Sequence, residues 1–164
     1  PTPPPPPPPR PPFPTRRSSD LLEASRPGTT LPEIHAAALR TLCEGMVQLG
    51  ILKGEVDKLI ETEAYKPYYM HGTSHWLGLD VHDVGAYVVK NGNGEAKPRP
   101  LVPGMAFTIE PGLYVSADDQ NAPEAFRGLG IRIEDDIVIT ESGILNLTEA
   151  IPKQVEDVEA WVKS

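Results

Sequence analysis

Residues 71–83 read HGTSHWLGLDVHD, and this stretch is the most informative part of the chain. It holds three of the four histidines, His71, His75 and His82. Glycines interrupt the stretch, so we predict strand and turn from His71 to Gly85. Clustered imidazoles are typical of a metal or catalytic site. An alternative is that His71 and His75 are two exposed residues on one helix face, which the glycines on both sides disfavour.

Two predicted strands further along the chain each carry a glutamate. In Met105–Glu110, Glu110 alternates with the large apolar residues, and the Pro-Gly pair after it predicts a turn that stops the strand and exposes its end. In Gly130–Thr140, Glu134 shares a face with Arg132, opposite two isoleucines. A structural ion pair between Glu134 and Arg132 is one interpretation. Because a buried carboxylate is costly without a compensating cation, the two glutamates and the histidines fit a shared ion better, with Mn, Zn, Co or Fe as suitable metals.

Helical patterns surround these strands. Thr30–Glu33 has the form of a capping box, and a helical stripe follows over Ile34–Leu49 before Gly50. A shorter helix is predicted at Val56–Glu63, and an amphipathic helix at Lys153–Lys163 after Pro152. The valines expected on the inner side of this last helix are Val155, Val158 and Val162. Helices mixed with strands that carry polar residues indicate an α+β domain.

Two further segments are predicted to be irregular. Asn91–Gly94 is a strong turn signal, and the chain from there to Pro100 is predicted to be a loop. Pro1–Pro12 is nearly all proline, which excludes helix and sheet and predicts a disordered, extended tail. Phe13–Leu21 reads FPTRRSSDL, the translation of a common sequencing adapter, so we interpret residues 1–21 as a low-complexity, non-native tail. A docking peptide for SH3-like domains is the alternative interpretation of the proline run.

The composition excludes several classes of partner. The chain has 164 residues and a formal net charge of −8, which opposes binding to nucleic acids and to anionic membranes. No apolar run is long enough to span a bilayer, and no signal peptide is recognisable. The single cysteine, Cys43, lies among apolar residues and is predicted to be a core thiol. A reducing cytoplasm is therefore the expected location.

The motifs resemble those of aminopeptidase P (Xaa-Pro aminopeptidase), a family of pita-bread metallopeptidases. The resemblance rests on three strings in the family's order, HGTSHWLGLDVHD at 71–83, TIEPGLY at 108–114 and GIRIEDD at 130–136. It implies an incomplete pita-bread (creatinase/aminopeptidase-like) fold in which residues 22–164 form the C-terminal part of the catalytic domain. The implied activity is release of the N-terminal residue from peptides with proline in the second position. A prolidase and a non-catalytic pita-bread peptide-binding module are the alternatives.

The same resemblance assigns the metal ligands. It implies that His75, Glu110 and Glu134 hold two divalent metal ions, expected to be Mn²⁺, with Zn²⁺, Co²⁺ or Fe²⁺ as alternatives. The family also uses two aspartates upstream of the first predicted helix, and no aspartate of this chain maps onto them. We therefore expect a truncated chain that binds one ion weakly and has little or no peptidase activity. Homo-oligomerisation of a full-length form stays open.

The resemblance also assigns the residues that act on the peptide. It implies that His71, His82 and Glu110 are catalytic, and that His71, His82, Arg132 and Tyr114 bind the substrate. A hydroxide that bridges the ions would attack the carbonyl before proline. His82 would stabilise the developing oxyanion, and Glu110 would relay the proton to the leaving nitrogen.

Overall fold

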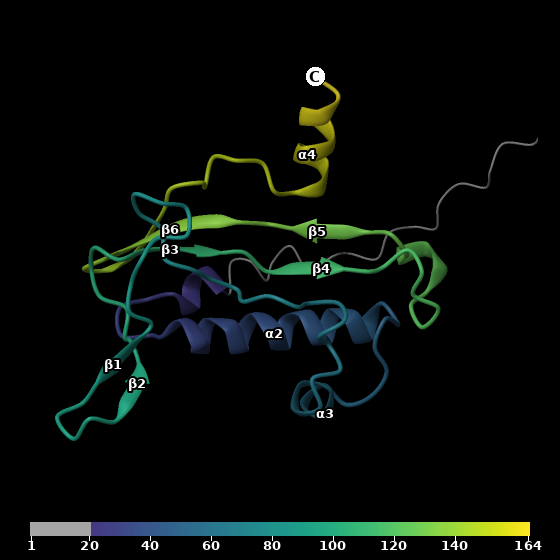
Figure 1. Ribbon diagram of the computed structural model, residues 1–164. Helices are drawn as coiled ribbons and strands as arrows, with labels where there is room; N and C mark the ends of the chain where they lie inside the picture. Colours follow the sequence, from purple (N-terminus) through teal and green to yellow (C-terminus); the bar gives the residue numbers. More distant parts are fainter. Residues whose placement is uncertain (1–20) are drawn as a thin grey trace, which may run out of the picture.

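The computed structural model describes residues 21–164 as a layer of strands packed on helices (Figure 1). The strand pairings are antiparallel, and helix and sheet occur together, as the predicted α+β class implies. The tail proposed for residues 1–21 lies outside the described residues except for Leu21. The side chain of Leu21 is 3% exposed and belongs to the core.

The helices are α2 (Leu31–Gln48), α3 (Val56–Glu61) and α4 (Val155–Val162), and a short 3-10 helix η1 spans Glu124–Phe126. The strands are β1 (Val88–Lys90), β2 (Ala96–Pro98), β3 (Ala106–Ile109), β4 (Gly112–Tyr114), β5 (Gly130–Arg132), β6 (Asp135–Thr140) and β7 (Gly143–Asn146).

Helix α2 begins as the sequence predicts. The Glu33 carboxylate accepts a hydrogen bond from the backbone N–H of Thr30 at 2.8 Å, which satisfies a donor that the first turn leaves unpaired. The helix lies beneath β3, β4, β5 and β6 along almost its full length (Figure 1). Its first half packs through Ile34 and Ala38 into one core cluster with residues of β3 and β6. Its second half packs through Cys43 into a second cluster, and Cys43 is fully buried, as predicted.

The strands above α2 form one long antiparallel ribbon. β3 pairs with β6, and β4 pairs with β5, while β7 adds a third strand beside β6. The pairing keeps the same register in both parts, because Ile109 faces Asp135 before the interruption and Gly112 faces Arg132 after it. Continued through the interruption, this register places Glu110 opposite Glu134. The two glutamates therefore occupy facing positions on neighbouring strands, at the point where both strands are interrupted.

The prediction of one strand over Gly130–Thr140 is wrong at this point, because Ile133 and Glu134 lie between β5 and β6. The expected turn after Glu110 is also wrong. The chain continues past Pro111 into β4, and Glu110 is 8% exposed instead of lying at an open strand end. Proline has no N–H to give to the ladder, so the pairing pauses without the chain reversing.

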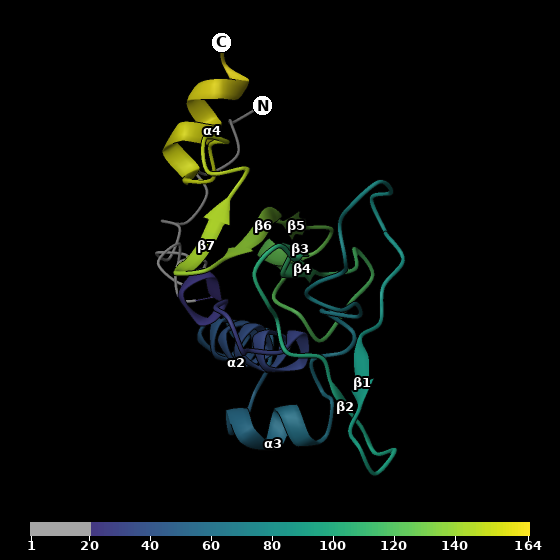
Figure 2. The same cartoon turned by 90° about the vertical axis from the view of Figure 1, so that its left-hand side faces the viewer.

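The last helix also differs from its prediction. The three valines expected on its inner side are exposed, at 37% for Val155, 37% for Val158 and 80% for Val162. Helix α4 stands away from the body on the far side of the strands from α2 (Figures 1 and 2). No residue of α4 is buried among the described residues, so the apolar stripe indicates a face without a partner here.

Two other boundaries shift. Helix α3 ends at Glu61, two residues before the predicted end, and Glu63 adopts a left-handed backbone with φ of 55°. The predicted turn at Asn91–Gly94 is present, but the following loop contains β2, which pairs with β1 in an exposed hairpin. Within residues 21–164, no helix is both long and apolar enough to cross a membrane.

Candidate metal centre

His75 lies in the segment from His71 to Gly85, which was predicted to be strand and turn and is irregular in the structure. Contacts with β3 hold His75 in place. Its backbone N–H donates to the Thr108 hydroxyl at 3.1 Å, and the Thr108 N–H donates to the His75 carbonyl at 3.0 Å. The ring Nδ1 lies 3.0 Å from the Trp76 carbonyl oxygen, which can only accept. Nδ1 therefore carries the hydrogen, and in the neutral ring Nε2 keeps a lone pair for a metal.

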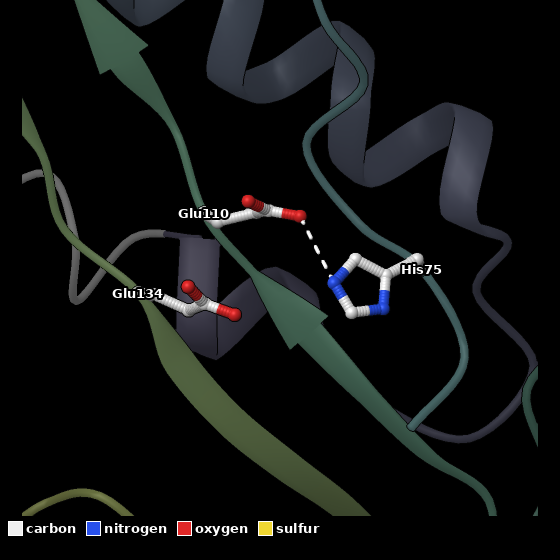
Figure 3. Close-up of side chains that lie close together, drawn as sticks. All are labelled: His75, Glu110 and Glu134. Atoms are coloured by element: carbon white, nitrogen blue, oxygen red, sulfur yellow. Dashed lines mark ion pairs between the residues drawn. The ribbon is translucent and has the colours of Figure 1, made fainter. Parts of the chain in front are cut away.

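The lone pair of His75 faces the carboxylates (Figure 3). Its Nε2 lies 3.3 Å from Glu110 Oε1. One ligand atom from each of His75, Glu110 and Glu134 lies within 4.8 Å of the other two. Metal–ligand bonds of roughly 2.0–2.2 Å would bring such atoms together around one ion. The sequence thus identified three residues that the fold gathers from a loop and two strand interruptions.

The two facing carboxylates give this group its electrostatic character. Partial burial, followed by the negative charge of Glu110, raises the pKa of Glu134 above its ordinary value. Like charges that face each other across strands are destabilising, and Arg132 offsets only part of the charge, with Nη1 at 3.3 Å from Glu110 Oε2. An imidazole lone pair and two carboxylates form a donor set that suits a divalent transition metal. The residues present therefore fit a metal ion.

Arg132, Tyr114 and His71 form a chain of hydrogen bonds beside the ligands. Arg132 Nε donates to the Tyr114 hydroxyl at 2.6 Å, and this hydroxyl lies 3.0 Å from His71 Nε2. The His71 Nδ1 hydrogen goes to the carbonyl of Gly72 at 2.7 Å, so Nε2 accepts from Tyr114. Gly112 makes room for the chain, because a Cβ there would lie 2.5 Å from the Tyr114 hydroxyl.

His82 reaches the group from an exposed part of the same loop. Its ring stacks on that of His75, with centroids 4.0 Å apart and planes 13° from parallel. All seven residues singled out from the sequence therefore lie in one connected region. His71 joins it through Tyr114 and Arg132, and Arg132 in turn pairs with Glu110.

Two features of the region were not found from the sequence. Thr108 is fully buried, ties His75 to β3 and lies 3.4 Å from Glu110 Oε1, and its place two residues before Glu110 on the same strand face could have indicated it. The fourth histidine, His35 on α2, lies with Nδ1 2.8 Å from the hydroxyl of Thr73. Burial, and then the neighbouring His71, lowers the pKa of His35. Nothing in the local sequence around His35 indicated this position.

A pocket adjoins His71 on the side of α2 and α3. Its cavity volume is about 360 Å³. The residues that line it are His35, Tyr65, Lys66, Tyr69, Met70, His71 and Gly72. Burial raises the pKa of Tyr69 to about 12, so its hydroxyl stays protonated 2.6 Å from Thr73 Oγ1.

Comparison with known proteins shows the family of the chain. Residues 18–141 match the profile of Metallopeptidase family M24, and the chain belongs to that family. Over 139 residues it is 54% identical to the Xaa-Pro aminopeptidase of Escherichia coli K12. The aligned region covers 85% of this chain and 30% of the relative. It is 41% identical over 145 residues to Xaa-Pro aminopeptidase 3 of Homo sapiens, covering 85% of this chain and 26% of that protein.

Solved structures give the same result for the fold. The zinc-substituted aminopeptidase P of E. coli in complex with product superposes with a TM-score of 0.79 at 51% identity. The match covers 88% of this chain and 31% of that chain. The predicted pita-bread fold is thus confirmed, and the chain spans about a third of the length of the relatives that it matches.

Proposed function

We propose that this chain carries part of the metal centre of an Xaa-Pro aminopeptidase that uses two divalent ions, with Mn²⁺ as the expected metal. The observation that carries the proposal is the convergence of His75, Glu110 and Glu134 within 4.8 Å. Identity to Xaa-Pro aminopeptidases over most of the chain supports the choice of reaction. Peptides with proline in the second position are the proposed substrates.

The proposed ligands are His75, Glu110 and Glu134. Divalent ions held by them would polarise the scissile carbonyl and lower the pKa of a water molecule. Glu110 is the proposed proton carrier, because Oε1 faces His75 while Oε2 faces Arg132 at 3.3 Å. A carboxylate in this position can take up a proton and release it to the leaving nitrogen.

Four other residues are proposed to hold the peptide. His82, stacked on His75, is placed to stabilise negative charge on the carbonyl oxygen. Tyr114 and Arg132 orient the ring of His71 through the hydrogen-bond chain, so His71 presents one tautomer to the substrate. The nitrogen of the leaving proline is tertiary in the substrate and has no N–H to donate. We therefore expect the proline ring to be selected by shape against His71 and Tyr114.

We infer that residues 22–164 belong to a larger catalytic domain, that residues 1–21 are not native to it, and that the enzyme works in the cytoplasm. Among the described residues, the only group that could hold a metal contains three ligands, so we expect one weakly bound ion and little or no peptidase activity from this chain alone.

Metal titration tests the proposal. Equilibrium dialysis of the chain against Mn²⁺ is expected to give one site, and His75→Ala should weaken its affinity by at least about tenfold. His35→Ala is the matched control, because it removes a histidine of the same region outside the three ligands. The proposal fails if no Mn²⁺ binds, or if both variants bind as well as the parent chain. Two tight sites would contradict the expected single ion.

A further inference from the structure

Directly after Glu134, a buried carboxylate collects three hydrogen-bond donors. Oδ1 of Asp135 receives the side-chain N–H of Asn146 at 2.8 Å and the hydroxyl of Thr148 at 2.9 Å. The Lys153 ammonium lies 3.0 Å from the same oxygen. The side chains of Asp135 and Lys153 are 5% and 17% exposed, so this is a largely buried ion pair.

The ammonium of Lys153 also donates hydrogen bonds to the backbone of the segment before it. It donates to the carbonyl of Thr148 at 2.6 Å and to that of Ile151 at 3.2 Å. The Thr148 hydroxyl accepts the backbone N–H of Asp136 at 3.1 Å. The segment after β7 is therefore tied to the start of β6 by side chains as well as by strand pairing. We call this set, Asp135, Asn146, Thr148 and Lys153, the β6 clasp.

The β6 clasp lies next to the interruption in the strand pairing. Strand pairing is interrupted at Glu110 and Glu134, and Asp135 is the first residue of β6 to regain a partner, Ile109. Because β4–β5 and β3–β6 share one register, the chain stays extended through Glu134, and neighbouring side chains there point to opposite faces. The buried side chain of Asp135 is thus held on one face while Glu134 is presented on the other, and the backbone between them has little freedom.

We propose that Asp135 and Lys153 are positioning residues of the metal centre, which hold Glu134 in place through the backbone of β6. The inference rests on the proposed metal function. A shared metal ion requires Glu110 and Glu134 to stay close despite their repulsion. The contacts of Asp135 anchor the residue next to Glu134 and do not touch the metal. Helix α4 has no part in it, because no residue of that helix is buried.

The test measures Mn²⁺ affinity in folded variants of the whole chain. Lys153→Met is expected to weaken Mn²⁺ binding about tenfold, the size found for groups that orient metal ligands, and Lys153→Arg should restore most of it. Lys58→Met removes an exposed ion pair with Glu61, whose atoms lie 2.8 Å apart, and should leave the affinity unchanged. Deletion of residues 154–164 should also leave it unchanged, because the β6 clasp ends at Lys153.

A loss of stability alone must be separated from a loss of positioning. Met46→Ala opens a cavity in the second core cluster and lowers stability away from the clasp, so its Mn²⁺ affinity should match that of the parent chain. If Lys153→Met does not fold, Thr148→Val removes one donor to Asp135 and is expected to weaken binding several-fold. Equal affinity in the folded clasp variants and the parent, or equal weakening by Met46→Ala, overturns the inference alone. Failure of the parent chain to bind Mn²⁺ overturns the proposed function with it.

Discussion

At the scale of residues, the facing pair of Glu110 and Glu134 links the fold to the chemistry. Glu110 is 8% exposed, and the nearest positive group, Arg132, lies 3.3 Å from one of its oxygens. A second carboxylate opposite it is an electrostatic cost that a folded chain retains for a purpose such as cation binding. His75 directs a lone pair rather than a hydrogen toward these two carboxylates, which completes the proposed set of metal ligands.

The burial of Glu134, together with its repulsion by Glu110, predicts how stability depends on pH. Because the folded-state pKa of Glu134 is raised, the folded protein holds this proton more tightly than the unfolded chain, where the pKa is about 4.3. Stability from this group is therefore present at low pH and is lost as pH rises from that value through the raised pKa. In metal-free protein at pH 7, Glu134→Gln is expected to increase the free energy of unfolding by about 0.5 kcal/mol, with screening by solvent included.

Urea unfolding at pH 7 and pH 4 measures this effect. The gain should shrink toward zero at pH 4, and the control Glu141→Gln, on the exposed turn between β6 and β7, should change little at either pH. Saturating Mn²⁺ should reverse the order, since the parent chain then gains more from the ion. A destabilised Glu134→Gln protein at pH 7 without metal would show that the carboxylate has a structural partner instead.

The sequence indicated these residues only in part. Resemblance of three short motifs pointed to the three proposed ligands, and period-two alternation in β3 could also have indicated Thr108 beside Glu110. The facing position of Glu134 could not be predicted, because it depends on the pairing of strands separated by the segment that contains η1. Over such a distance no short hairpin turn fixes the strand register.

At the scale of elements, α2 shows what periodicity can predict. Its stripe was identified from apolar spacing, its start from the capping box, and both are present. The same reasoning failed for α4, whose valines are exposed. An apolar stripe indicates which face a helix would bury, but whether another element covers that face depends on the rest of the molecule.

Paired substitutions measure this difference between the helices. Ile34→Ala, at a fully buried position of α2, is expected to cost about 2–5 kcal/mol of unfolding free energy because it leaves a cavity beneath β3 and β6. Val158→Ala on α4 should change it by less than about 0.5 kcal/mol. Chemical denaturation followed by circular dichroism gives both values. A large loss at Val158 would mean that α4 packs against the body in solution.

The interruptions in the ribbon could not be predicted from the sequence, for a different reason. The Pro-Gly pair after Glu110 is a turn signal in isolation, yet the chain runs straight on because β5 still pairs with β4 beyond the gap. Tertiary pairing thus overrides a local turn signal directly after Glu110, a proposed metal ligand. Failures of local sequence signals, such as the Pro-Gly turn signal here, are expected at sites where function competes with regular structure.

At the scale of the whole molecule, the chain is one part of a larger arrangement in its relatives. It spans about 30% of the length of the Xaa-Pro aminopeptidase of E. coli. Large apolar side chains are exposed in the loop that carries His82, including Leu79 at 103% and Val84 at 90%. The three proposed ligands nevertheless converge within this chain, so the proposed metal site can be tested without further protein.

Anomalous X-ray diffraction from crystals of this chain grown with Mn²⁺ tests the central claim most directly. The account predicts one anomalous peak at about 2.0–2.2 Å from Nε2 of His75 and from a carboxylate oxygen of Glu110 and of Glu134. The peak should vanish in crystals of Glu110→Gln. A map without a peak among these three side chains, or with the ion bound elsewhere, would contradict the account.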